Sequence, residues 1–192
     1  MKQPGNMRLR WLAVTIAIAV GLQNCAQAEY LRPVADEYAI KAVFLYNLVK
    51  YAEWPPRSPL SAPELPIVLA IVGEDPFGRA LDEAVKDRTV RGRQIQVVRT
   101  SDPTGLKNLH MAFISAECNP ARIVELVQAL AARSVLTVGD TERTAKAGVA
   151  VNFVMMQGKV RFDIDQRAAR GKHIELSSQL LKLARRVLEA EN

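Results

Sequence analysis

Cysteine and histidine are scarce in this sequence, with two of each among 192 residues. A disulfide-dense scaffold and a thiolate zinc cage both need more cysteines, so neither is expected. His110 and His173 have no partner at metal-ligand spacing, and His110 lies inside an apolar run typical of a core strand. A nucleophile–base pair needs a histidine or an equivalent base close to a Ser or Cys. The sequence therefore predicts no catalytic residues, no metal site and no cofactor.

A long hydrophobic run is also missing. The apolar stretch from Trp11 to Leu22 is shorter than the roughly 20 residues that a membrane-spanning helix needs. It follows a basic leader and precedes Ala26-Gln27-Ala28, the small-x-small pattern that signal peptidase cleaves. We expect a signal peptide over residues 1–28 and one exported domain over residues 29–192. The alternative is a lipoprotein anchored at Cys25, but the residue before that cysteine is not small.

Strong charge of one sign is the third absence. Loss of Lys2, Arg8 and Arg10 with the leader would lower the formal net charge from +6 to +3. A nucleic-acid-binding protein carries a stronger basic patch, so nucleic acid is not an expected partner. Cleavage would also leave Cys118 as the one mature cysteine. A partly buried apolar role is the favoured interpretation of Cys118, and an intermolecular disulfide or a redox-sensitive thiol is the alternative.

What the sequence does contain is a helix with two apolar faces, between Glu37 and Trp54, ended by Pro55 and Pro56. One face, with Asn47 in its middle, contains Ile40, Val43, Phe44, Leu48 and Tyr51. The other contains Tyr38, Ala42, Leu45 and Val49. A helix on the outside of a small domain needs only one apolar face. Either the domain covers this helix on two sides, or a partner covers the second side.

Aromatic and apolar side chains on such a helix are typical of interface anchors. We therefore expect a partner or dimer interface formed by Tyr38, Leu45, Asn47, Val49 and Trp54. On this hypothesis, Leu45→Asp or Val49→Asp weakens association and leaves the domain folded. Complete burial of the helix in its own domain carries equal weight, because apolar residues are usually core residues.

The rest of the chain alternates strands with helices. Ile67 to Val72 reads as a buried parallel strand, and further strands are expected over residues 94–98, 109–115 and 134–138. The intervening helices begin at cap-plus-proline pairs such as Asn119-Pro120. Residues 149–155 and 159–164 read as an antiparallel hairpin, followed by a last helix from Ser177 to Leu188. The predicted fold is a single-domain α/β three-layer sandwich, with a mostly parallel sheet and an antiparallel hairpin edge.

The strand ends also suggest a possible small-ligand crevice. Open parallel sheets bind ligands at the carboxyl ends of their strands, here near Gly73, Ser115 and Gly139. The turn after the first strand, Gly73-Glu74-Asp75-Pro76-Phe77-Gly78, lacks the spacing of a dinucleotide loop and the lysine of a phosphate loop. Its two carboxylates would repel phosphate, so it is interpreted as a turn that caps a helix.

Four segments in register resemble the YfiR family of periplasmic regulators. They are Glu37 to Pro55, Ile71 to Gly78, Val135 to Asp140, and Ile174 to Leu181. The resemblance implies an α/β sandwich, a periplasmic location and a homodimer. It also implies binding to the periplasmic part of an inner-membrane diguanylate cyclase of the YfiN type, with an outer-membrane lipoprotein of the YfiB type as a possible second partner. Relatives can carry disulfides, and this chain departs from that pattern.

The resulting hypothesis is a non-enzymatic periplasmic regulator that represses a membrane diguanylate cyclase and so controls cyclic di-GMP signalling and biofilm formation. The alternative is a periplasmic small-ligand binding protein of a transport or sensor system. An envelope hydrolase ranks last, because the sequence offers no catalytic set.

Overall fold

A computed structural model describes residues 36–55, 62 and 64–189. The expected signal peptide, Cys25 and most of the proline-rich connector after Pro55 lie outside the described residues. From Tyr38 onward the chain forms one compact unit. Within the described ranges, no helix combines the length and the apolar character that crossing a membrane requires.

The chain begins with a helix over residues 36–51, called here the N-terminal helix. The elements after it, in chain order, are β1 (Ala52–Glu53), β2 (Ile67–Val72), α2 (Arg79–Val85), β3 (Thr89–Val90), β4 (Arg93–Thr100), β5 (Leu109–Ile114), α3 (Pro120–Ala131), β6 (Leu136–Gly139), α4 (Glu142–Lys146), β7 (Val151–Met156), β8 (Lys159–Asp165), α5 (Gln166–Arg170), β9 (Glu175–Leu176), α6 (Ser178–Leu183) and β10 (Arg186–Leu188).

One eight-stranded sheet organises the unit, in the order β10-β8-β7-β6-β5-β2-β4-β3. The adjacent pairs β4–β2, β2–β5, β5–β6 and β6–β7 are parallel, and β7 and β8 form an antiparallel hairpin. The predicted α/β fold with a mostly parallel sheet is confirmed. The chain places β4 on one side of β2 and then forms β5 on the opposite side of β2. The strand order reverses there, so the topological switch point of the sheet lies between β2 and β5.

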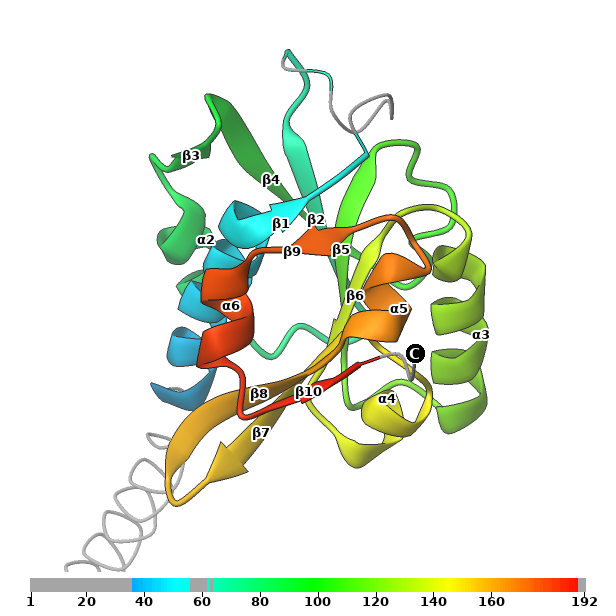
Figure 1. The fold of residues 1–192 in the computed structure, drawn as a ribbon. Helices are drawn as coiled ribbons and strands as arrows, with labels where there is room; N and C mark the ends of the chain where they lie inside the picture. The colour runs from blue at the N-terminus through cyan, green and yellow to red at the C-terminus, as the bar shows by residue number, and fades with distance from the viewer. Residues whose placement is uncertain (1–35, 56–61, 63, 190–192) are drawn as a thin grey trace, which may run out of the picture. The chain divides into compact units, whose positions relative to one another are not determined.

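Helices cover both faces of this sheet, which explains why β2 and β5 are apolar and buried along their whole length (Figure 1). Alternate residues of each strand belong to two separate cores. Leu69, Ile71 and Phe113 pack in the core that contains the N-terminal helix and α2. Ala70, Val72 and Ile114 pack in the core that contains α3, and the three layers follow from this alternation.

Local capping chemistry determines where several helices begin. The Asn119 side chain accepts a hydrogen bond from the Ala121 N–H, and Pro120 occupies the first turn of α3. Asp165 accepts from the N–H groups of Arg167 and Ala168 and starts α5. These caps are short-range features, and the sequence predicted the Asn119-Pro120 start of α3 correctly. The turn from Gly73 to Gly78 was interpreted as a helix cap, but α2 begins only at Arg79, and no side chain caps it.

The end of the chain differs from the sequence-based expectation. The predicted last helix over residues 177–188 was wrong, because α6 ends at Leu183 and β10 follows it. Strand β10 pairs in parallel with β8, and Arg185 and Arg186 both bind the Asp163 carboxylate of β8. This pairing continues the sheet, so the β7–β8 hairpin lies next to the edge strand instead of forming the edge.

The N-terminal helix also ends before Trp54, where its apolar pattern had predicted its end. The chain becomes extended at Ala52 and Glu53, which form β1 and pair with β9 in a separate two-stranded sheet. The Tyr51 C=O accepts a hydrogen bond from the Ser177 N–H, next to this short ladder. A tertiary contact with the C-terminal part of the chain therefore determines where the helix ends.

Candidate functional site

The N-terminal helix turns one of its two apolar faces into its own domain. Ala42, Leu45 and Val49 are fully buried in the core shared with α2 and the sheet. Leu45 and Val49 were expected at a partner interface, and the structure places both side chains where only their own domain contacts them. Trp54 is also largely buried, and its indole N–H donates to the Ser134 C=O at 3.1 Å.

The other face of this helix is only partly covered. Ile40 and Val43 are 48% and 44% exposed, and Asn47 is half-buried. Residues three and four apart share a helix face, so these three side chains form one strip, called here the helix strip. Phe44 beside it packs edge-on against Phe162 of the hairpin, with ring centroids 5.5 Å apart. The uncovered part of the second apolar face is therefore the helix strip.

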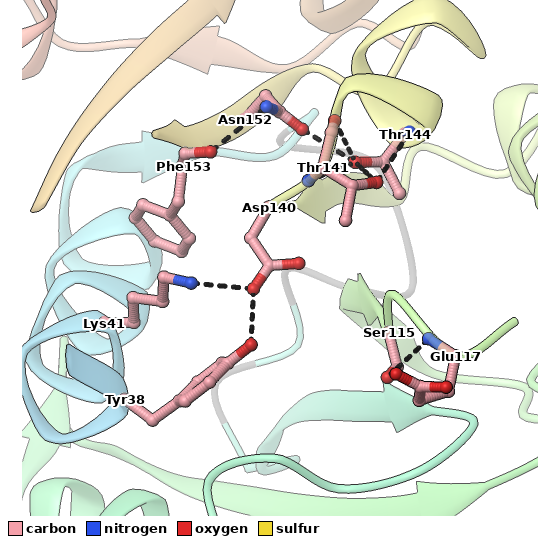
Figure 2. Close-up of polar contacts among 9 residues, drawn as sticks. All are labelled: Tyr38, Lys41, Ser115, Glu117, Asp140, Thr141, Thr144, Asn152 and Phe153. Carbon is pink, nitrogen blue, oxygen red and sulfur yellow. Dashed lines mark hydrogen bonds and ion pairs between the residues drawn. The ribbon is translucent and has the colours of Figure 1, made fainter. Parts of the chain in front are cut away.

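A buried polar cluster joins the same helix to the end of β6, and sequence reasoning missed it. Asp140 follows Gly139 at the carboxyl end of β6 (Figure 2). Its Oδ2 accepts hydrogen bonds from the Lys41 ammonium at 2.7 Å and from the Tyr38 hydroxyl at 2.8 Å. The Lys41 and Asp140 side chains are each 3% exposed. The sequence offered two signals: Lys41 lies between the apolar faces of the helix, and Asp140 follows a buried strand. No local pattern indicates that two residues so distant in sequence form a pair.

The second oxygen of this carboxylate has a different environment. Asp140 Oδ1 is buried and has no hydrogen-bond partner within the described structure. A buried acceptor without a donor costs about 1–3 kcal/mol, so the cluster carries an unfavourable contribution beside its ion pair. The lysine ammonium that faces Oδ2 compensates the charge of the carboxylate and makes its burial tolerable.

Gly139, one of the expected crevice residues, faces α4. A Cβ atom at Gly139 would lie 2.3 Å from Thr144 Oγ1, so no other residue fits without a shift. Thr144 forms a capping box with Thr141 and donates to the Asn152 side chain at 2.7 Å (Figure 2). These contacts fill the space beside Gly139 with protein atoms.

Gly73 and Ser115, the other two crevice residues, are brought together at the switch point. The Ser115 N–H donates to the Val72 C=O at 3.0 Å. A Cβ at Gly73 would lie 3.4 Å from the Ser115 Cβ and 2.7 Å from the Cys118 sulfur. The loops after β2 and β5 therefore pack against each other here, while Gly139 faces α4.

Cys118 is a free, half-buried thiol beside this contact. Its sulfur lies 3.5 Å from the Val72 C=O, within hydrogen-bonding distance for a thiol donor. Burial raises the pKa of the Cys118 thiol, against a smaller opposite effect of Arg122. A raised pKa keeps the sulfur in its less nucleophilic thiol form, which matches the favoured role as a small apolar residue.

The chemistry-bearing side chains elsewhere have structural contacts. His110 Nδ1 accepts from the Val68 N–H at 3.0 Å, and its Nε2 lies 2.9 Å from an Arg93 nitrogen. In the described part of the chain, no three His, Cys, Asp or Glu residues gather as a metal site would need. His110 thus acts as a buried link between β5 and its surroundings.

The fold resembles solved α/β structures. A conserved domain protein from Vibrio cholerae superposes with a TM-score of 0.53 at 10% identity, covering 76% of this chain and 60% of that one. An ABC domain in complex with L-Trp from Streptococcus pneumoniae gives a TM-score of 0.48 at 10% identity, covering 81% and 60%. The chain thus aligns to about three fifths of each structure's length. At such identity the first likeness concerns the fold alone.

The sequence comparisons are more specific. A search of curated proteins finds no match to this chain. The family model described as YfiR/HmsC-like matches residues 38–185, which is most of the chain and includes both the helix strip and the Asp140 cluster. The chain therefore belongs to the YfiR/HmsC-like family.

Proposed function

We propose that this protein is a non-enzymatic periplasmic regulator that binds the periplasmic part of an inner-membrane diguanylate cyclase and holds that cyclase inactive. Export by the signal peptide over residues 1–28 would deliver it to that compartment. Lower cyclase activity would lower cyclic di-GMP and biofilm formation. Homodimerisation and release by an outer-membrane lipoprotein belong to the same proposal.

Membership of the YfiR/HmsC-like family is the observation that carries this proposal. The helix strip supports it, because exposed apolar residues on a helix are suited to contact another protein. Ile40 and Val43 are nearly half exposed, although the same helix buries Leu45 completely. Since Leu45 and Val49 lie in the core, the contact surface proposed on this helix is the strip of Ile40, Val43 and Asn47.

The physical requirement on such a regulator is differential affinity. A regulator shifts a cyclase toward its inactive state only by binding that state more tightly than the active one. A shift from 1:99 to 99:1 needs about a 10⁴-fold difference in affinity. Loss of one or two apolar contacts in the interface would therefore be visible in the cyclase output.

The test compares two substitutions of the same residue type. Val43 on the helix strip and Val124 on α3 are both valines with 44% exposure. We expect Val43→Asp to reduce the recovery of the membrane partner by at least about tenfold in co-purification, since a buried charge without a partner is costly. Val124→Asp is the matched control and should leave recovery unchanged.

The cellular readout separates this proposal from other functions. Deletion of the gene should raise cyclic di-GMP, and the wild-type protein or Val124→Asp should restore the low level while Val43→Asp should not. Sedimentation of both variants tests whether Val43 also supports a dimer. Unchanged cyclic di-GMP in the deletion strain would reject the cyclase partner, and a metabolite that co-purifies in place of a membrane protein would favour a ligand-binding role.

A further inference from the structure

The edge of the sheet at β4 is open over most of its length. β4 runs from Arg93 to Thr100 and pairs along β2 on one side. On its other side, β3 pairs only with Arg93 and Gln94, and no strand in the described structure pairs with the six residues that follow. In Figure 1, β3, β4 and α2 lie together at this side of the sheet, away from the hairpin.

The hydrogen bonds around β4 show which of its peptide groups face the open side. The Gly73 N–H donates to the Thr100 C=O at 3.1 Å, so the Thr100 peptide group faces β2. Peptide groups alternate in direction along a strand, so those of Gln96 and Val98 also face β2. The N–H and C=O groups of Ile95, Val97 and Arg99 therefore face outward. The antiparallel pairing of β3 with Arg93 agrees with this alternation.

Natural proteins usually protect such an edge with proline, a bulge, charged side chains or a covering element. The open part of β4 reads Ile-Gln-Val-Val-Arg-Thr and contains neither a proline nor a bulge. Its one charged side chain, Arg99, is bound to Asp75 and Asp82. Its outward N–H and C=O groups have the spacing that an added β-strand needs.

A groove runs beside this edge. A cavity of about 470 Å³ is lined by Ile95 and Val97 of β4 and by α2 side chains. A second cavity of about 350 Å³ extends it toward β3 and shares Val85, Lys86 and Ile95 with the first. The half-buried Ile95 and Val97 pack against the core on the α2 side, so one strip of apolar surface continues from the core into the groove.

The charges of the groove favour an acidic segment. Asp82 is bound by Arg99 at 2.8 Å, and Glu83 lies 3.8 Å from Arg79. Lys86 lines both cavities, and Asp87 and Arg88 also line the second one. Among the described residues no ion pair involves Lys86, so two basic side chains face one acid there. An acidic side chain on an incoming peptide could pair with Lys86.

We propose that the open edge of β4, with the groove between β4 and α2, binds an extended peptide segment of a partner protein as an added β-strand. Its backbone pairs with Ile95, Val97 and Arg99, an apolar side chain enters the groove, and an acidic side chain meets Lys86. The site lies on different elements from the helix strip and does not depend on the cyclase proposal.

The experiment uses the exported protein, expressed from its full-length gene, and a synthetic seven-residue peptide of alternating Thr and Val with one central Glu. Amide hydrogen exchange should slow at Ile95, Val97 and Arg99 on peptide addition. Gln96 and Val98 should not change, because their N–H groups already face β2. Protection without this alternation, or no protection at millimolar peptide, would overturn the proposal.

Variants test the edge and the groove separately. Val97→Pro removes an outward N–H while keeping the N–H groups that pair with β2, and should weaken peptide binding about tenfold. Ile95→Glu places a charge in the groove and should also weaken binding, while Gln96→Glu, on the opposite face of the same strand, is the matched control. Equal binding by Val97→Pro and wild type would reject the added strand. Edge protection that rises with protein concentration alone would assign the edge to a second copy and would also reject the proposal.

Discussion

The Lys41 ammonium lies 2.7 Å from Asp140 Oδ2, and this buried pair joins the first turns of the N-terminal helix to the carboxyl end of β6. Lys41→Met should lower the free energy of unfolding by about 3 kcal/mol or more, because it leaves a buried carboxylate without its counter-charge. The double variant Lys41→Met with Asp140→Asn should lose less, because no charge remains buried. Urea denaturation measures both, and a double variant no more stable than the single one would contradict the expectation.

Gly139 is held close to α4 by Thr144. Gly139→Ala should lower the free energy of unfolding by about 1–3 kcal/mol, because the new Cβ would overlap the Thr144 side chain and force β6 and α4 apart. Gly105→Ala is the control, since nothing lies within 4 Å of a Cβ at that position. Thermal unfolding compares the two, and similar stabilities would show that the contact relaxes at little cost.

Lys172 is a buried lysine whose ammonium donates to Thr137 Oγ1 at 2.8 Å. Burial lowers the pKa of Lys172 to about 8, against a smaller opposite effect of Asp165. Above this pKa the unfolded chain binds more protons, so the stability contribution should rise by about 3 kcal/mol from pH 8 to about 10.5. Below pH 8 the destabilisation by this residue is constant.

The stability difference between wild type and Lys172→Met should therefore grow in favour of wild type over that alkaline range. Other groups titrate there too, but they contribute equally to both proteins and cancel in the difference. A difference between wild type and Lys172→Met that stays flat over that range would contradict the lowered pKa.

Asp163 holds β10 to β8 through Arg185 and Arg186. Burial raises the pKa of Asp163, but the two arginines outweigh this effect and the net pKa is lowered. Its stabilising contribution is thus present at neutral pH and lost as the pH falls below about 4, through the lowered pKa. Asp163→Asn should speed hydrogen exchange at Val187 in β10 and leave the central strands protected. Asp102→Asn, at an exposed ion pair with Arg122, should not affect β10.

Most of the fold could be predicted because its signals are local. The continuous apolar run of β2 required helices on both faces, and Asn119-Pro120 determined the start of α3 within one turn. The prediction of the last helix was wrong because the structure of that segment depends on contacts with residues distant in sequence. Its apolar spacing near Val187 fits a helix, but pairing with β8 and the contacts of Arg185 with Asp163 favour a strand there. Non-local hydrogen bonds outweigh helical propensity in a short segment.

The candidate sites were predicted less completely. Periodicity showed that the N-terminal helix has two apolar faces, but it could not show that Leu45 turns inward and Val43 stays on the surface. Nor could it show that Gly73 and Ser115 pack together while Gly139 meets α4. Each of these outcomes depends on which elements become neighbours.

The amino-acid sequence by itself determined the α/β layering, the start of α3 and the family, because these are encoded in short spacings along the chain. Only the tertiary structure decided that Lys41 meets Asp140, that β10 extends the sheet beyond the hairpin and that β4 keeps an open edge. The physical reason is that an ion pair or a strand pairing forms between residues far apart in sequence, and local patterns do not specify which distant groups become partners.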